Sequence, residues 1–108
     1  MAKVVAVAPD LLLASRIEAT LAAAGHDVEL ASSVSDLPAS LEGVDLLVVD
    51  VDRADAEAVA DLGLPVLGFY PHVNVDARER AEAAGVDLVV PRSRLARELP
   101  ALVERLLR

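Results

Sequence analysis

Three aspartates stand where their carboxylates could act together, because each lies just beyond an apolar run. Asp10 follows residues 3–8, and Asp50 and Asp52 follow residues 44–49. If both runs are parallel strands, their carboxyl ends meet at one edge of a sheet and the three carboxylates converge there. Carboxylate oxygens are the ligands that Mg²⁺ prefers in proteins. Asp10, Asp50 and Asp52 are therefore candidate metal ligands.

Each aspartate also has a structural interpretation. Asp10 and Asp52 stand near the starts of expected helices, where an aspartate side chain caps free backbone N–H groups. Asp50 could close the turn that follows its strand. We favour capping for Asp10 and Asp52, and the pattern alone leaves both interpretations open.

The elements that must position these groups alternate between short apolar runs and amphipathic stretches, which is typical of βαβ units. The expected strands are residues 3–8, 28–31, 44–49, 66–70 and 88–90. The expected helices are residues 10–24, 35–42, 53–62 and 76–84, with a last one inside 93–108. Pro100 would interrupt a helix that starts at Ser93, so we expect a turn and a helix from about Arg97, or a kink. The predicted fold is α/β: a flavodoxin-like, doubly wound, five-stranded parallel sheet in the order 2-1-3-4-5, with helices on both faces.

Composition limits the classes of function. A chain of 108 residues is predicted to form one domain, 1–108. Its net charge of -8 would repel a phosphate backbone, and it has one Phe and one Tyr to stack on bases, so we expect no nucleic-acid partner. Without cysteine it can form neither a disulfide nor a thiolate metal site. No apolar run approaches the roughly 18 residues that span a membrane, so we expect no membrane partner and a cytoplasmic location.

Four segments carry a resemblance that covers the whole length. They are LAAAGHDVELASS (21–33), VDLLVVD (44–50), LPVLGFY (64–70) and GVDLVVPRS (85–93). In pattern and spacing the chain resembles the receiver domain of response regulators, which is CheY-like. In that family the aspartate ending the third strand accepts a phosphoryl group from a histidine kinase, with Mg²⁺ held beside it. The resemblance therefore implies that Asp50 is the phosphoacceptor and that Mg²⁺ is a possible cofactor.

The sequence departs from the family at several positions. Ala8-Pro9 stands where an acidic pair is expected, and Asp10 alone follows. Tyr70 falls at the position of a small hydroxyl residue, and Arg92 replaces the phosphate-gripping lysine. Tyr70 and Arg92 are thus the phosphate-binding or switch candidates that the resemblance implies, although Arg and Lys are not interchangeable. Val89 has no ring at the position of the switch aromatic.

Charge is divided unevenly along the chain. Residues 91–108 contain five Arg and two Glu, whereas residues 1–90 contain five Lys or Arg and 16 acids. This basic stretch is either a solvated helix surface or a docking surface. Receivers commonly pair through the face that residues 76–84, 88–90 and 93–108 would form, so the resemblance implies a possible homodimer there.

These observations favour an atypical receiver, or pseudo-receiver, that stands alone and acts through protein-protein contacts with phosphorylation weak or absent. It would not be an enzyme, and its partner would be a histidine kinase or a signalling target. The alternative is a working phosphorelay receiver that is phosphorylated on Asp50 with Mg²⁺. His72 has no Ser, Cys or carboxylate spaced to form a triad with it. A small flavodoxin-like enzyme or cofactor-binding domain is a remote third, because the loop after residue 8 lacks phosphate-binding glycines.

Overall fold

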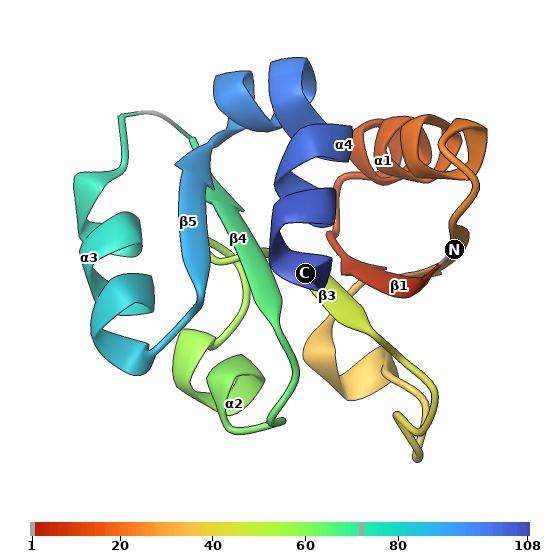
Figure 1. The fold of residues 1–108 in the computed structure, drawn as a ribbon. Helices are drawn as coiled ribbons and strands as arrows, with labels where there is room; N and C mark the ends of the chain where they lie inside the picture. Colours follow the sequence, from red (N-terminus) through yellow and green to blue (C-terminus); the bar gives the residue numbers. More distant parts are fainter. Residues whose placement is uncertain (1, 72) are drawn as a thin grey trace.

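The computed structural model describes residues 2–71 and 73–108, which form a five-stranded parallel sheet with helices on both faces (Figure 1). The strands are β1 (Lys3–Val7), β2 (Asp27–Ala31), β3 (Leu46–Asp50), β4 (Val66–Tyr70) and β5 (Leu88–Pro91). Their order in the sheet is β2-β1-β3-β4-β5, and every neighbouring pair is parallel. The flavodoxin-like order 2-1-3-4-5 predicted from the sequence is confirmed.

In the part of the chain that the structure describes, four α-helices cover the sheet in two layers. They are α1 (Leu11–Ala23), α2 (Ala56–Ala60), α3 (Val75–Ala84) and α4 (Arg92–Leu107). Buried residues of α1 and α4 belong to one core cluster, and buried residues of α2 and α3 belong to the other. Among the strands, β3 and β4 are buried at every position, because a sheet covered on both faces needs apolar side chains pointing both ways.

The helix expected over residues 35–42 is wrong. The chain forms only a three-residue 3-10 turn there, Val34–Asp36, and then leaves it at Leu37. Leu37 has the extended angles φ -63° and ψ 147° because it precedes Pro38, whose ring disfavours the helical region for the residue before it. The hydroxyls of Ser32 and Ser33 donate to the Asp36 carboxylate and do not cap a longer helix.

Of the two expectations for the last helix, the turn followed by a start near Arg97 is wrong. Helix α4 begins at Arg92, without a turn before Arg97, and Pro100 lies inside it. Proline removes one backbone N–H donor, but the apolar stripe of this helix buries Leu95 and Leu99 against the sheet. Packing against the core therefore outweighs the local cost of the proline.

Candidate functional site

A cavity of about 350 Å³ lies at the carboxyl edge of the sheet, where the crossovers diverge to opposite faces. Its lining includes the three aspartates singled out above, one proline from each of two strand ends, and two arginines. These residues are Pro9, Asp10, Asp50, Asp52, Arg53, Pro71 and Arg92. The topology thus brings Asp10, Asp50, Asp52 and Arg92 to one place.

Asp50 ends β3 and is the one buried charged residue among those that the structure describes, with 8% of its surface exposed. Burial raises the pKa of Asp50 because it disfavours the charged form. The backbone N–H of Asp52 donates to Asp50 Oδ1 at 3.1 Å and partly opposes that rise, as do the charges of Arg92 and Arg53. The charge of Asp52 acts in the other direction and raises the pKa further.

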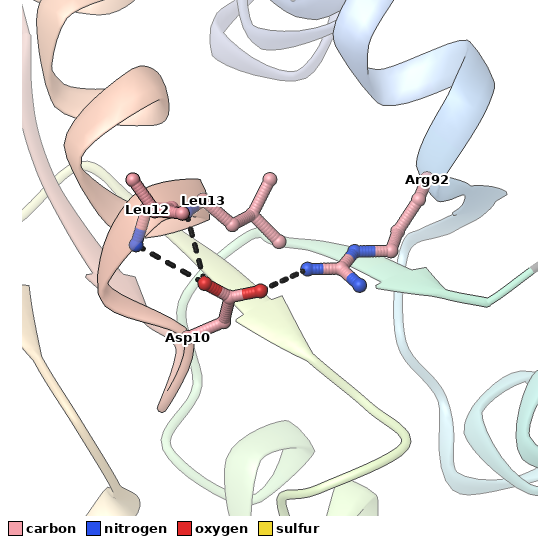
Figure 2. A network of polar contacts seen from close by, with 4 residues as sticks. All are labelled: Asp10, Leu12, Leu13 and Arg92. Atoms are coloured by element: carbon pink, nitrogen blue, oxygen red, sulfur yellow. Dashed lines mark hydrogen bonds and ion pairs between the residues drawn. The ribbon is translucent and has the colours of Figure 1, made fainter.

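Asp10 is engaged on both of its oxygens (Figure 2). Its Oδ1 caps α1 by accepting from the backbone N–H groups of Leu12 at 3.1 Å and Leu13 at 3.3 Å. Its Oδ2 accepts from the Arg92 guanidinium at 2.9 Å. The hydrogen bond from Arg92, followed by the one from Leu13, lowers the pKa of Asp10. Asp10 therefore has the capping role that the sequence favoured, and it joins the first turns of α1 and α4.

Asp52 does not cap a helix, so that expectation is wrong. The cap of α2 is Asp55, which accepts from the N–H groups of Glu57 and Ala58. The Asp52 carboxylate instead accepts a hydrogen bond from the side-chain amide of Asn74. The chain makes a tight turn after Asp50 before α2 can start, which places the N-cap at Asp55, three residues beyond Asp52.

The carboxylates of this edge do not fit a magnesium site. A hard cation of this size needs several free oxygens in near-octahedral array. Both oxygens of Asp10 are engaged by protein donors, and Asp52 is held by Asn74. Within residues 2–71 and 73–108, no three His, Asp or Glu side chains are grouped so that they could hold a metal ion.

Two residues of this edge were missed by the sequence reading. Arg53 lines the cavity, and its charge is one of those that lower the pKa of Asp50. Asn74 caps α3 by accepting from the N–H of Ala77 at 3.1 Å while its amide donates to Asp52. An Asn immediately before a helical stretch is a capping signal, so Asn74 could have been found as a cap. No sequence signal gives its second contact.

Tyr70 lies elsewhere. It is 5% exposed and belongs to the core cluster beneath α2 and α3, whereas its neighbour Phe69 belongs to the cluster beneath α1 and α4. The adjoining cavity-lining residue is Pro71. His72 lies outside the described residues. The part of the chain that is described contains no helix long and apolar enough to cross a membrane.

No protein-family model matches this chain, and no curated protein matches it either. Solved structures do resemble it. One is NtrX from Brucella abortus in complex with ADP, with a TM-score of 0.84 and 18% identity over 98% of this chain. This chain spans only 27% of that NtrX chain.

Two shorter neighbours match along nearly their whole length. A response regulator receiver domain protein from Clostridium thermocellum has a TM-score of 0.85 at 15% identity, over 99% of this chain and 94% of that one. The chemotaxis protein CheY4 from Vibrio cholerae has a TM-score of 0.82 at 22% identity, over 99% of each chain. At these identities the likeness concerns the fold.

Proposed function

We propose that this chain, which has the fold of response-regulator receiver domains, is an atypical or pseudo-receiver that signals through contacts with other proteins and is phosphorylated weakly or not at all. A protein partner, such as a histidine kinase or a signalling target, and a cytoplasmic location are parts of this proposal. One observation carries it. The carboxylates around Asp50 are already bonded to groups of the protein itself.

The chemistry of phosphoryl transfer explains why those bonds matter. Catalysis of this step consists mostly of positioning and of neutralising the charge on the transferring group. Around Asp50 the neutralising groups are Arg53 and Arg92, and Arg92 is held by Asp10 at 2.9 Å.

Tyr70 adds a second difference from a working switch. In a receiver, the small hydroxyl residue at this strand position bonds the phosphoryl group, as the family pattern implies. Tyr70 instead packs in the core beneath α2 and α3. The Tyr70 side chain is therefore buried in the core, away from a phosphoryl group on Asp50. This supports a domain that partners recognise by its surface as it stands, without a rearrangement caused by phosphorylation.

Intact-mass measurement after incubation with Mg²⁺ and acetyl phosphate tests the proposal. We expect at most a minor fraction of the wild-type chain to gain a phosphoryl group, so that its mass spectrum differs little from that of Asp50→Asn. A receiver with a complete acidic pair, treated in parallel, controls for an active phosphodonor. A one-phosphoryl adduct on most of the chain that disappears in Asp50→Asn would instead establish the alternative, a working phosphorelay receiver.

Thermal unfolding with and without Mg²⁺ gives an independent reading. A ligand that binds only the native state raises the melting temperature by mass action. Because we expect Mg²⁺ not to bind this chain, we expect it to leave the melting temperature unchanged. A rise that is lost in Asp50→Asn would show that the cation binds beside Asp50 and would contradict the proposal.

A further inference from the structure

The outward face of α4 carries a stripe of arginines. This helix packs beside α1 on one face of the sheet and buries its leucines there (Figure 1). At a rotation of about 100° per residue, four arginine positions fall within an arc of about 80° on the side away from the core. They are Arg94, Arg97, Arg105 and Arg108, the last directly after the helix, and we call them the arginine stripe.

The arginine stripe is symmetric about Ala101, an exposed residue at its centre. Arg97 and Arg105 lie four residues to either side of Ala101, and Arg94 and Arg108 lie seven residues to either side. Offsets of four and seven residues return to the same face of a helix. At a rise of about 1.5 Å per residue the stripe is about 21 Å long, with a pair of arginines toward each end and a small side chain between the pairs.

The helix itself neutralises the arginine stripe only in part. Glu98 is shared by Arg94, at 3.4 Å, and Arg97, at 3.9 Å. At the other end one glutamate oxygen lies 3.1 Å from Arg108, and Arg105 forms no ion pair within the described part of the chain. The side chains of Arg97 and Arg108 are 71% and 78% exposed, so these ion pairs lie in water and contribute little. The stripe therefore keeps a net positive charge.

The symmetry of the stripe excludes its pairing with the same stripe of a second copy. In an antiparallel pair of α4 helices that cross at Ala101, each arginine of the stripe would face an arginine of the other copy. Like charges held opposite one another are destabilising. Helix α3 of a second copy is not complementary either, because Arg78 and Arg80 stand among its three acidic residues.

Nucleic acid and membranes also fit the stripe poorly. Glu98 and Glu104 flank it, one on each side, and a phosphate backbone with a charge every few Å would face these glutamates as well as the arginines. A helix that binds a bilayer surface buries apolar side chains in the lipid, whereas the leucines of α4 are buried against the sheet. Carboxylates on a protein helix, by contrast, can be spaced so that they meet only the arginines.

We infer that the arginine stripe docks an acidic helix of a partner protein, whose carboxylates repeat the spacing of the arginines. A guanidinium can bind a carboxylate through two parallel hydrogen bonds, which adds geometric specificity to the attraction. The small side chain of Ala101 allows the two helix axes to approach closely at the centre. Because the stripe is symmetric, the acidic helix can lie along α4 in either direction.

This inference rests on the proposed function, since it names the chemistry of the partner of a domain that acts through contacts. The net charge of -8 does not prevent the contact. At physiological salt the field of an exposed charge is largely screened beyond about 8 Å, so carboxylates seated on the stripe respond mainly to the stripe itself. Binding should accordingly weaken as salt is added.

Fluorescence anisotropy with a synthetic peptide tests the inference on the whole chain. The probe is a labelled, alanine-rich helical peptide whose glutamates have the spacing of the arginine stripe. The control peptide has the same composition, with its glutamates distributed around the helix. We expect the spaced peptide to bind about fivefold more tightly or better at low salt. Equal binding of the two peptides, or binding of neither, would overturn the inference.

Two double variants with the same change of net charge locate the contact. Arg97→Gln/Arg105→Gln removes the inner arginines and should raise the dissociation constant of the spaced peptide about tenfold. Arg16→Gln/Arg80→Gln removes two exposed arginines of α1 and α3 and should change that constant less than about twofold. Equal losses in both would show a diffuse attraction and contradict a site on α4. Unchanged melting curves would show that both variants fold.

The other occupants are separated by replacing or omitting the peptide. Phosphatidylserine vesicles or a DNA duplex that bound more tightly than the spaced peptide, and lost binding in Arg97→Gln/Arg105→Gln, would overturn the assignment to an acidic protein. Sedimentation equilibrium without peptide should show a single copy. A dimer that this variant dissociates would assign the stripe to a second copy instead. Phosphorylation is read by mass at Asp50, so the two proposals fail separately.

Discussion

The two helical layers of this domain meet the sheet with side chains of different size. Helices α1 and α4 have 13 and 16 residues, and α2 and α3 have five and ten. The buried residues of the α1/α4 layer are mostly Ile and Leu: Ala14, Ile17, Leu21, Leu95, Leu99, Leu102 and Val103. Those of the α2/α3 layer are smaller: Val59, Ala77 and Ala81. We therefore expect the α2/α3 layer to lie closer to its strands and to tolerate added volume less well.

Each layer also bonds one of the aspartates that line the cavity beside Asp50. Arg92 holds Asp10 within the α1/α4 layer, in a pair whose side chains are 39% and 47% exposed. Asn74 holds Asp52 from the start of α3, in a partly buried contact. Asp50 lies between them, on the central strand β3. The carboxylates on both sides of Asp50 are thus bonded within the two helical layers. Those bonds would have to break before the same groups could bind a ligand.

The largest expected effect comes from adding volume on the α2/α3 side. A Cβ at Gly68 would lie 2.8 Å from Cγ1 of Val51 and 3.2 Å from Cγ1 of Val86. Gly68→Ala should lower the free energy of unfolding by about 2 kcal/mol, the usual scale of an overpacked core. Urea denaturation would measure it.

Val51→Ala provides the matched test of the cause. It removes the atom that the new Cβ would strike, so the loss in the double variant should be smaller than the sum of the two single losses. If Gly68→Ala instead stabilises the protein, as removing a strand glycine does where there is room, the α2/α3 layer is not the tighter of the two.

How far the fold could be predicted follows from which forces are local. Strand β4 occupies residues 66–70 as expected, because proline stands at both of its ends. The short apolar runs also defined the other strands to within two residues. No helix forms over 35–42, because Pro38, three residues after the expected start, disfavours the helical conformation of Leu37, although the serines before it could have capped a helix. For α4 the error was the reverse, since tertiary packing overrode Pro100.

For the site, the sequence could give positions but not partners. Strand order alone brings Asp10, Asp50 and Asp52 to one edge, and that part required only the topology. The contact of Asp52 with Asn74 joins residues 22 apart, and that of Asp10 with Arg92 joins residues 82 apart. Neither separation carries a local signal, so side-chain geometry was needed to show that these carboxylates are engaged.

Between the two layers, Asp50 should be better tolerated as an amide. Asp50→Asn keeps an oxygen that can accept from the Asp52 N–H and removes a desolvated charge. We expect the free energy of unfolding to rise by about 1 kcal/mol at neutral pH. Because burial raises the folded pKa of Asp50, the native state binds the proton more tightly than the unfolded chain. The cost of the charge is therefore present above the folded pKa and disappears as pH falls below the ordinary Asp range.

Urea denaturation of Asp50→Asn and wild type from acidic to neutral pH would follow this difference. The two curves of stability against pH should converge at low pH and separate as pH rises. A variant that is less stable than wild type at neutral pH would mean that Arg53 and Arg92 stabilise the carboxylate more than burial disfavours it.

The smallest effect is expected at the exposed pair of the α1/α4 layer, where the two roles of Asp10 can be separated. Asp10→Asn keeps a side-chain oxygen that can cap α1 but loses the negative charge that pairs with Arg92. Asp10→Ala loses both the cap and the charge. Melting temperatures should therefore fall in the order wild type, Asn, Ala.

The folded pKa of Asp10 is lowered, so its charge stabilises the protein above the ordinary Asp range, and this contribution is lost as pH falls through the folded pKa. Salt should reduce the difference between wild type and Asn, because it screens an exposed ion pair, and leave the difference between Asn and Ala, which reflects an uncharged cap. If salt reduced both differences equally, the ion pair with Arg92 and the cap of α1 would not be separable contributions of Asp10.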